Sequence, residues 1–215
     1  MKLGFVIPYR NREEHLSIFV AHMKKFIKDI EYKIFVVEQT ETKPFNRGKL
    51  LNIGAKHAFD EGYDYVALHD VDMIPLEADY SPVSKPIHMA TNAEQFGWVL
   101  PANNYFGGVT LFDKDSFYKV NGFNNEYWGW GGEDDDLYDR CKKEGVEWDR
   151  RKGMYQSLPH HRTNNHHPNY KSNEHLLNEQ QFGKVDYKNH GLSNLKYEIL
   201  KDETNEEYRL IRVEI

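Results

Sequence analysis

Short apolar runs alternate with stretches of helical periodicity over the first part of the chain. Residues 3–9, 32–39 and 63–75 contain the apolar runs, which are typical of buried β-strands. Residues 12–30 and 46–62 instead place apolar side chains at the spacing of an amphipathic helix. Strands and helices in this alternating order predict a parallel, doubly wound α/β sheet with right-handed crossovers.

The second half of the chain has a weaker pattern. Residues 105–113 predict a strand after a glycine turn, and residues 133–145 predict a helix with acidic residues in its first turn. Residues 160–175 are rich in histidine and asparagine and predict a polar loop, while residues 195–215 predict a terminal hairpin. No repeat or low-complexity linker divides the sequence, so we expect residues 1–215 to form a single α/β domain.

Composition restricts the class of protein. A chain of 215 residues is long enough for one domain with a buried core, and its net charge of -6 argues against a nucleic-acid partner. The single cysteine, Cys141, excludes an internal disulfide framework and fits a structural thiol in a reducing compartment. The N-terminal residues have no signal-peptide pattern, and no apolar run predicts a membrane span. We therefore expect a cytoplasmic protein.

Polar and charged residues follow the predicted strands, at the sheet edge where ligands bind in folds of this kind. Alternation along the third strand places Asp70 and Asp72 on one face. Two carboxylates at a strand end are suitable ligands for a divalent cation, which would in turn hold the phosphates of a nucleotide. The alternative is that both residues are solvated acids of a loop.

Three arginines lie beside aromatic rings near the first two strand ends. The guanidinium group suits phosphate oxygens and also stacks on a nucleobase, and a neighbouring ring would cover a uracil. These clusters predict a nucleotide site, and the alternative is a set of surface ion pairs to Glu13 and Glu14. The residues concerned are Tyr9, Arg10, Arg12, Phe45 and Arg47.

The segment 126–140, EYWGWGGEDDDLYDR, places two tryptophans and three glycines directly before four consecutive acidic residues. Asp134 or Asp135, at a helix start, would have its ionisation tuned by the helix dipole and by neighbouring carboxylates. Such a carboxylate would take a proton from a sugar hydroxyl while a tryptophan supports the sugar, and Glu133 would bind another hydroxyl. An ordinary acidic first turn is the alternative, but it leaves the glycines, which permit close ligand approach, unexplained.

A second group of polar residues is a histidine cluster in the predicted loop. Neutral imidazole is a frequent metal ligand, although solvated loop histidines are more common. We expect one of the four to bind the metal. The cluster consists of His160, His161, His166 and His167.

Six motifs carry a resemblance to a known family. They occur in the order seen in the β-1,4-galactosyltransferases, glycosyltransferase family 7, and the likeness extends over residues 3–215. The opening motif and ALHDVDMIPL are most similar to the xylosylprotein 4-β-galactosyltransferase branch, whereas WGWGGEDDD is more similar to the branch that acts on N-acetylglucosamine. The motifs are FVIPYRNREEHL, FNRGKLLNIG, HDVDMIP, YFGGVTLF, NGFNNEYWGWGGEDDDLYDR and GLSNLKYEIL.

The resemblance implies a GT-A fold, UDP-galactose as donor, Mn²⁺ as cofactor and inversion at the anomeric carbon. It implies a nucleotide-sugar-binding half, residues 1–110, and an acceptor and catalytic half, residues 111–215. Asp134 matches the catalytic base of the family, with Glu133 and Asp135 as acceptor-binding neighbours.

The donor site also follows from the resemblance. Tyr105 matches a tyrosine that favours galactose over N-acetylgalactosamine, and Trp130 matches the tryptophan of a mobile loop. Asp70 matches the partner of the metal-binding aspartate, close to the donor. The complete set of donor-site matches is Pro8, Tyr9, Arg10, Arg12, Phe45, Arg47, Asp70, Tyr105 and Trp130.

The metal site departs from the family pattern. Asp72 matches the metal-binding aspartate, but the later ligands of the family appear as Met-x-x-His or His-x-His, and YQSLPHHRT keeps neither pattern. His160 stands at the histidine position, with Ser157 in place of the methionine. A shift of one residue would select His161 instead.

The function implied is transfer of galactose to the 4-hydroxyl of a xylose- or N-acetylglucosamine-type acceptor on a glycan or glycoconjugate, in β linkage. One alternative is a transferase on the same scaffold that uses UDP-N-acetylgalactosamine or UDP-glucose. Another is a catalytically weak carbohydrate-binding homologue. A nucleotide-sugar pyrophosphorylase is disfavoured because the glycine-rich phosphate loop expected near its N-terminus is not there.

Overall fold

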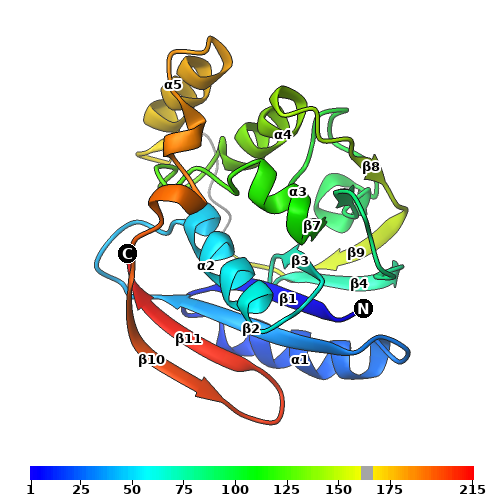
Figure 1. The fold of residues 1–215 in the computed structure, drawn as a ribbon. Helices are drawn as coiled ribbons and strands as arrows, with labels where there is room; N and C mark the ends of the chain where they lie inside the picture. Colours follow the sequence, from blue (N-terminus) through cyan, green and yellow to red (C-terminus); the bar gives the residue numbers. More distant parts are fainter. Residues whose placement is uncertain (161–166) are drawn as a thin grey trace.

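The computed structural model describes residues 1–160 and 167–215 (Figure 1). Within these ranges, eight strands form the main sheet in the order β10-β11-β2-β1-β3-β7-β5-β8, and three more form a small sheet in the order β4-β9-β6. The main sheet is parallel at its centre, where β1 lies between β2 and β3, and antiparallel where β7 joins β3. The strands of the main sheet are β1 (Leu3–Tyr9), β2 (Tyr32–Gln39), β3 (Tyr65–His69), β5 (Ile87–His88), β7 (Val109–Asp113), β8 (Asp149–Arg150), β10 (Glu198–Thr204) and β11 (Arg209–Glu214).

Helices cover the two faces of this sheet (Figure 1). The apolar side of α1 packs on one face, with Phe19 and Met23 against Phe5 of β1 in one hydrophobic cluster. Because side chains alternate along a strand, the next residue, Val6, points to the other face and joins the cluster beneath α2. The helices are α1 (Glu13–Phe26), α2 (Arg47–Asp60), α3 (Lys114–Lys119), α4 (Glu133–Lys143) and α5 (Tyr170–Gln181), with single 3₁₀ turns at η1 (Glu94–Phe96), η2 (Tyr187–Asn189) and η3 (Leu192–Asn194).

The predicted alternation of strands and helices in the first half is confirmed. The strands predicted at 3–9 and 32–39 have those bounds, and α1 and α2 lie inside the predicted helices. The side chain of Asn46 caps α2 by accepting a hydrogen bond from the backbone N–H of Lys49 at 2.9 Å. This cap fixes the first residue of α2 at Arg47.

The prediction of one continuous strand over 63–75 is wrong. The main-sheet strand β3 ends at His69, and the chain turns through Asp70 and Asp72 before β4 (Met73–Ala78) begins in the small sheet. The backbone N–H of Met73 donates to the carbonyl of Asp70 at 3.2 Å and closes this turn. The two aspartates consequently lie in a turn, and not on one face of a strand as predicted.

Two further predictions need correction. The strand predicted over 105–113 starts only at Val109, because Gly108 has a φ of 78°, which a continuing strand does not adopt. The loop predicted over 160–175 is helical from Tyr170, where α5 begins, and residues 161–166 lie outside the described part of the chain. The small sheet also contains β9 (Gly153–Ser157) and β6 (Asn92–Ala93).

The predicted terminal hairpin is confirmed, and one of its strands joins the main sheet. The strands β10 and β11 pair antiparallel, and β11 lies parallel to β2 with Arg209 opposite Phe35. Ile211 and Val213 of β11 are fully buried in the cluster beneath α2. The C-terminal strand is thus an inner strand of the sheet that carries the N-terminal half.

Two properties of the chain bear on the composition argument. Burial raises the pKa of the Cys141 thiol to about 12, which supports a structural and unreactive cysteine. Among the described helices, none is long and apolar enough to cross a membrane.

Candidate active site

One arginine at the start of α2 connects the acidic turn after β3 with the acidic run of α4. Arg47 Nε lies 2.6 Å from Asp70 Oδ1, and Arg47 Nη1 lies 2.8 Å from Asp134 Oδ1. A third carboxylate, that of Glu133, is 3.7 Å from the same Nη1. The Arg47 side chain is only 14% exposed, so these attractions act where water screens them little.

The carboxylates around Arg47 have shifted pKa values. Burial raises the pKa of Glu133 to about 7, and the neighbouring charge of Asp134 adds to this, although Arg47 acts in the opposite direction. Burial likewise raises the pKa of Asp70 to about 6, against the lowering effect of Arg47. Burial alone would lower the pKa of Arg47, but the carboxylates around it outweigh that effect and raise it. The site therefore concentrates negative charge around one fixed cation.

Asp72 lies on the other side of the turn and faces His160. Asp72 Oδ2 is 2.7 Å from His160 Nε2, and His160 Nδ1 is 3.1 Å from the guanidinium of Arg12. Burial would raise the pKa of Asp72, but the hydrogen bond and the charge of His160, together with a backbone hydrogen bond and the charge of Arg12, outweigh burial and hold that pKa below its usual range. Ser157 Oγ, at the position of the family's methionine, lies 3.9 Å from Met73 Sδ.

These residues fit a divalent cation with few protein ligands. A carboxylate oxygen and an imidazole nitrogen lie side by side in Asp72 and His160, and both are suitable ligands for Mn²⁺. Within the described ranges, no group of three or more His, Cys, Asp or Glu side chains is arranged to hold a metal. A cation held here would complete its coordination with phosphate oxygens and water, as cations bound with nucleotides commonly do. His161, the alternative ligand, lies outside the described residues.

If His160 is a metal ligand, replacing it with alanine should raise the Mn²⁺ concentration needed for half-maximal activity at least about tenfold, because one of few protein ligands is removed. Titration of Mn²⁺ binding in the presence of UDP, followed by electron paramagnetic resonance, measures the same loss without turnover. His161→Ala is the matched comparison and should change the titration less. A larger effect of His161→Ala would assign the ligand to that position instead.

The residues predicted to bind the nucleotide lie together at the ends of β1 and β2. The guanidinium of Arg10 lies 5.2 Å from the ring centre of Phe45, and its Nη1 donates to the carbonyl of Lys43 at 2.8 Å. The hydroxyl of Tyr9 accepts a hydrogen bond from the backbone N–H of Arg12 at 3.3 Å. Pro8 lies inside β1, opposite Val37 of β2. Among the described ion pairs, none joins these arginines to Glu13 or Glu14, so the surface-pair alternative is not supported.

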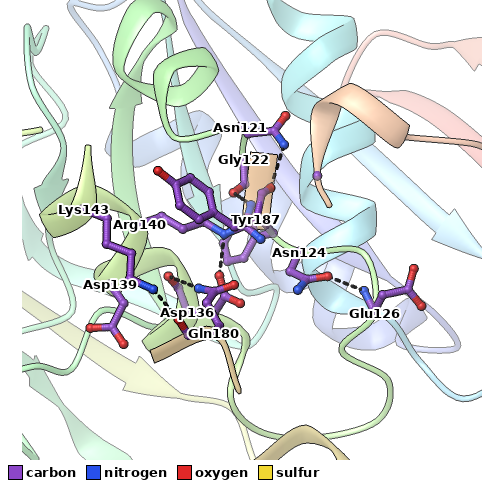
Figure 2. Close-up of polar contacts among 12 residues, drawn as sticks. Asn121, Gly122, Asn124, Glu126, Asp136, Asp139, Arg140, Lys143, Gln180 and Tyr187 are labelled. Carbon is purple, nitrogen blue, oxygen red and sulfur yellow. Dashed lines mark hydrogen bonds and ion pairs between the residues drawn. The ribbon is translucent and has the colours of Figure 1, made fainter. Parts of the chain in front are cut away.

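The acidic run is divided between two environments. Asp136 is fully buried and pairs with Arg140, whose Nε lies 2.5 Å from its Oδ1 (Figure 2). Arg140 Nη1 also donates to the carbonyl of Gly122 at 3.0 Å, and the guanidinium lies 5.4 Å from the ring centre of Tyr187. The fourth acid therefore anchors the first turn of α4, whereas Glu133 and Asp134 face Arg47. The sequence signal was the i,i+4 spacing of Asp136 and Arg140.

Asp134 also packs against the segment that precedes β7. A Cβ atom added to Gly107 would lie 2.4 Å from Asp134 Oδ2, so only glycine leaves room for this carboxylate. Burial raises the pKa of Tyr105, and the negative charges of Asp134 and Asp70 raise it further. Asp135 lies at the rim, where its Oδ1 is 3.4 Å from the side-chain nitrogen of Asn104.

The tryptophan segment before α4 is held by α5, which the sequence analysis missed. The ring of Trp130 is 40% exposed and stacks on Tyr170, with 5.7 Å between the ring centres. Asn173 Nδ2 donates to the carbonyls of Trp128 and Trp130 at 2.9 and 3.1 Å. The backbone N–H of Gly129 donates to the carbonyl of Phe45 at 2.7 Å. The tryptophan segment thus contacts Phe45, one of the residues predicted to bind the nucleotide, and directly precedes the acidic run.

The fold is that of the GT-A glycosyltransferases. A mannosyltransferase from Pyrobaculum calidifontis, solved with GDP-mannose and Mn²⁺, superimposes on 85% of the chain with a TM-score of 0.54 at 14% identity, and the match covers 63% of that structure. At this identity the likeness shows the fold alone.

Closer comparisons give the family. The model described as the N-terminal region of glycosyl transferase group 7 matches residues 1–81, and the model described as the N-terminal domain of galactosyltransferase matches residues 87–167. The catalytic domain of Drosophila β1,4-galactosyltransferase 7, solved with xylobiose, has a TM-score of 0.83 and 30% identity and covers 100% of this chain and 94% of that structure. The chain belongs to the β-1,4-galactosyltransferase family.

Curated relatives are more similar in sequence but longer. Rat β-1,4-galactosyltransferase 4 is 40% identical over 99% of the chain, and rat β-1,4-galactosyltransferase 6 is 43% identical over 74% of it. The chain spans 63% of the length of the first relative and 44% of the second.

Proposed function

We propose that the chain is a metal-dependent, inverting galactosyltransferase. It moves galactose from UDP-galactose to the 4-hydroxyl of a sugar acceptor of the xylose or N-acetylglucosamine type, in β linkage. The observation that carries the proposal is the position of Arg47, which binds Asp70 beside the candidate metal residues and Asp134 at the start of α4. One largely buried side chain thereby connects the predicted donor side of the site with the predicted acceptor side.

Asp134 is the group placed to act as general base. Its carboxylate lies 2.8 Å from Arg47 and packs closely on Gly107, so contacts within the protein orient it. In the proposed step it accepts the proton of the acceptor 4-hydroxyl while that oxygen bonds to the anomeric carbon. The bond from that carbon to the UDP oxygen breaks, and UDP leaves with the electron pair. Attack from the opposite side converts the α-linked donor into a β-linked product.

The remaining residues bind and orient the two substrates. Arg10 and Phe45 are placed to hold the nucleotide, and Asp72 with His160 would hold the cation. A bound Mn²⁺ supplies positive charge that offsets the negative charge developing on UDP. The exposed ring of Trp130, a donor-site match, offers an apolar surface to the bound sugar.

Glu133 and Asp135 flank the proposed base and are placed to bind acceptor hydroxyls. Burial raises the pKa of both carboxyls, and the charge of Asp134 adds to the shift in each case. Each has a polar neighbour already, Arg47 for Glu133 and Asn104 for Asp135. An acceptor hydroxyl entering between them would find oriented carboxylates on both sides of Asp134.

A solved relative supports the donor, the metal and one acceptor class. A mutant of Drosophila β1,4-galactosyltransferase 7, described as a complex with manganese, UDP-galactose and xylobiose, has a TM-score of 0.79 and 29% identity over 100% of this chain and 94% of that structure. The WGWGGEDDD motif supports the N-acetylglucosamine type as the second acceptor class. The assay must therefore include both.

The test is transfer from UDP-galactose, UDP-N-acetylgalactosamine and UDP-glucose, each with Mn²⁺ and with xyloside, N-acetylglucosaminide or no acceptor. We expect product only with UDP-galactose, stimulated by one acceptor class, and we expect Tyr105→Leu to broaden donor use. Product with another donor would give the alternative transferase. UDP binding with no product from any pair would favour the carbohydrate-binding homologue and overturn the proposal.

A further inference from the structure

The segment before β7 is held from outside the site by one arginine. Arg150, in β8, donates from its Nη2 to the carbonyl of Asn103 at 2.7 Å and to the carbonyl of Tyr105 at 3.0 Å. Its guanidinium also lies 4.9 Å from the ring centre of Trp148, whose ring packs edge-on against Phe106 at 5.6 Å. Arg150 therefore binds the backbone of the segment directly and reaches one of its rings only through Trp148.

Two other side chains form hydrogen bonds with the next two carbonyls of the same segment. Thr110 Oγ1, in β7, donates to the carbonyl of Phe106 at 2.8 Å. His88 Nε2, in β5, lies 3.0 Å from the carbonyl of Gly107, and burial lowers the pKa of this histidine to about 4. The neutral imidazole then donates through Nε2. Three consecutive carbonyls, from Tyr105 to Gly107, are each bound by a side chain from β8, β7 or β5, which are neighbours in the sheet.

The segment held by these hydrogen bonds contains two residues of the proposed site, Tyr105 and Gly107. The ring of Tyr105 packs edge-on against His88, with 5.4 Å between the ring centres, and lies in the electrostatic field of Asp70 and Asp134. Gly107 touches the Asp134 carboxylate. A shift of the segment would therefore move the Tyr105 ring relative to the donor sugar without removing any group that reacts.

We propose that Arg150 is a positioning residue that sets donor-sugar specificity through Tyr105. This inference rests on the proposed function, in which Tyr105 distinguishes galactose from N-acetylgalactosamine. Arg150 contacts neither Asp134 nor Asp72 among its described hydrogen bonds and ion pairs. Its loss should change the choice between donors more than it changes the rate with the preferred donor.

The neighbouring arginine provides a matched control. Arg151 Nη1 donates to the carbonyls of Asp79 and Ser81 at 2.7 and 3.0 Å, so it also binds two backbone carbonyls, but in the loop that follows β4. Arg151 also donates to the Ser81 hydroxyl at 3.0 Å and pairs with the Asp79 carboxylate at 3.4 Å, so Arg151→Met removes at least as many contacts as Arg150→Met. Arg150→Lys retains one cationic donor and should recover part of the wild-type behaviour.

The experiment measures kcat/KM for UDP-galactose and UDP-N-acetylgalactosamine with one acceptor. Arg150→Met should lower the ratio of the two values about tenfold, because a displaced ring no longer excludes the larger sugar. Arg151→Met should leave the ratio at its wild-type value. An unchanged ratio in Arg150→Met, or an equal fall in Arg151→Met, would overturn the proposal.

A second measurement separates this proposal from the proposed function. Amide hydrogen exchange should increase in a peptide covering residues 103–109 in Arg150→Met and remain at the wild-type level there in Arg151→Met. If the wild-type protein transfers no galactose, the proposed function fails, while exchange still tests the positioning role. Unchanged exchange in Arg150→Met would overturn that role whatever the donor.

Discussion

Asp134→Asn should lower kcat for galactosyl transfer about a thousandfold, because loss of a general base commonly removes a factor of this size. The amide is nearly isosteric with the carboxylate, but it cannot accept the proton of the acceptor hydroxyl. It can still fit against Gly107, where the carboxylate packs closely. Steady-state rates with UDP-galactose and the preferred acceptor measure the loss, and calorimetric titration of UDP should show nearly unchanged nucleotide affinity.

Asp139→Asn is the control for this experiment. Asp139 lies on the same helix and accepts a hydrogen bond from Gln181 at 2.8 Å, but it does not contact Arg47. Its replacement removes one negative charge from α4 and should leave kcat near the wild-type value. A residual rate in Asp134→Asn within about tenfold of wild type would assign the general base to another group.

Arg140→Met should lower the free energy of unfolding by about 3–5 kcal/mol, the range found when one member of a buried ion pair is removed. Both side chains of the Asp136–Arg140 pair are fully buried, and Asp136 would be left with an uncompensated charge. The hydroxyl of Tyr127 also interacts with the Asp136 carboxylate, but it is neutral and would not balance the charge left by the loss of Arg140. Urea unfolding followed by circular dichroism measures the change.

The exposed pair Lys56–Asp60 has the same i,i+4 spacing and provides the comparison. Its side chains are 45% and 57% exposed, and Lys56→Met should lower the free energy of unfolding by less than about 1 kcal/mol. The double variant Asp136→Leu with Arg140→Met should recover much of the lost stability, since no charge remains buried. Equal losses in Arg140→Met and Lys56→Met would show that the buried pair does not anchor α4.

The parts of the fold that sequence predicted best are those where burial and periodicity agree. The strands at 3–9 and 32–39 are apolar runs buried between helices, so pattern alone gives their bounds. The helix α5 was missed because its fully covered side chains are polar: Asn173 and Gln180 are buried by hydrogen bonding and not by an apolar face. Such a helix lacks the amphipathic pattern from which a helix is predicted.

The candidate site shows a similar division. The sequence analysis predicted Arg47, Asp70 and Asp134 in one site. In the structure, both carboxylates lie within hydrogen-bonding distance of the Arg47 guanidinium. The sequence pattern did not predict that Asp136, unlike its acidic neighbours, is fully buried. Arg150 was also missed, because the groups it binds are backbone carbonyls, which have no signature in side-chain pattern.

The position of β11 has a consequence for how the protein is made. This strand borders β2, which lies more than 160 positions earlier in the chain, so residues 209–214 must be synthesised before that edge of the sheet is covered. Until then, the growing chain exposes unpaired backbone groups of β2 beside the apolar surface that later receives Ile211 and Val213. An open strand edge of this kind invites pairing with another chain, so translation that stops before β11 should give an aggregating product and not a smaller folded one.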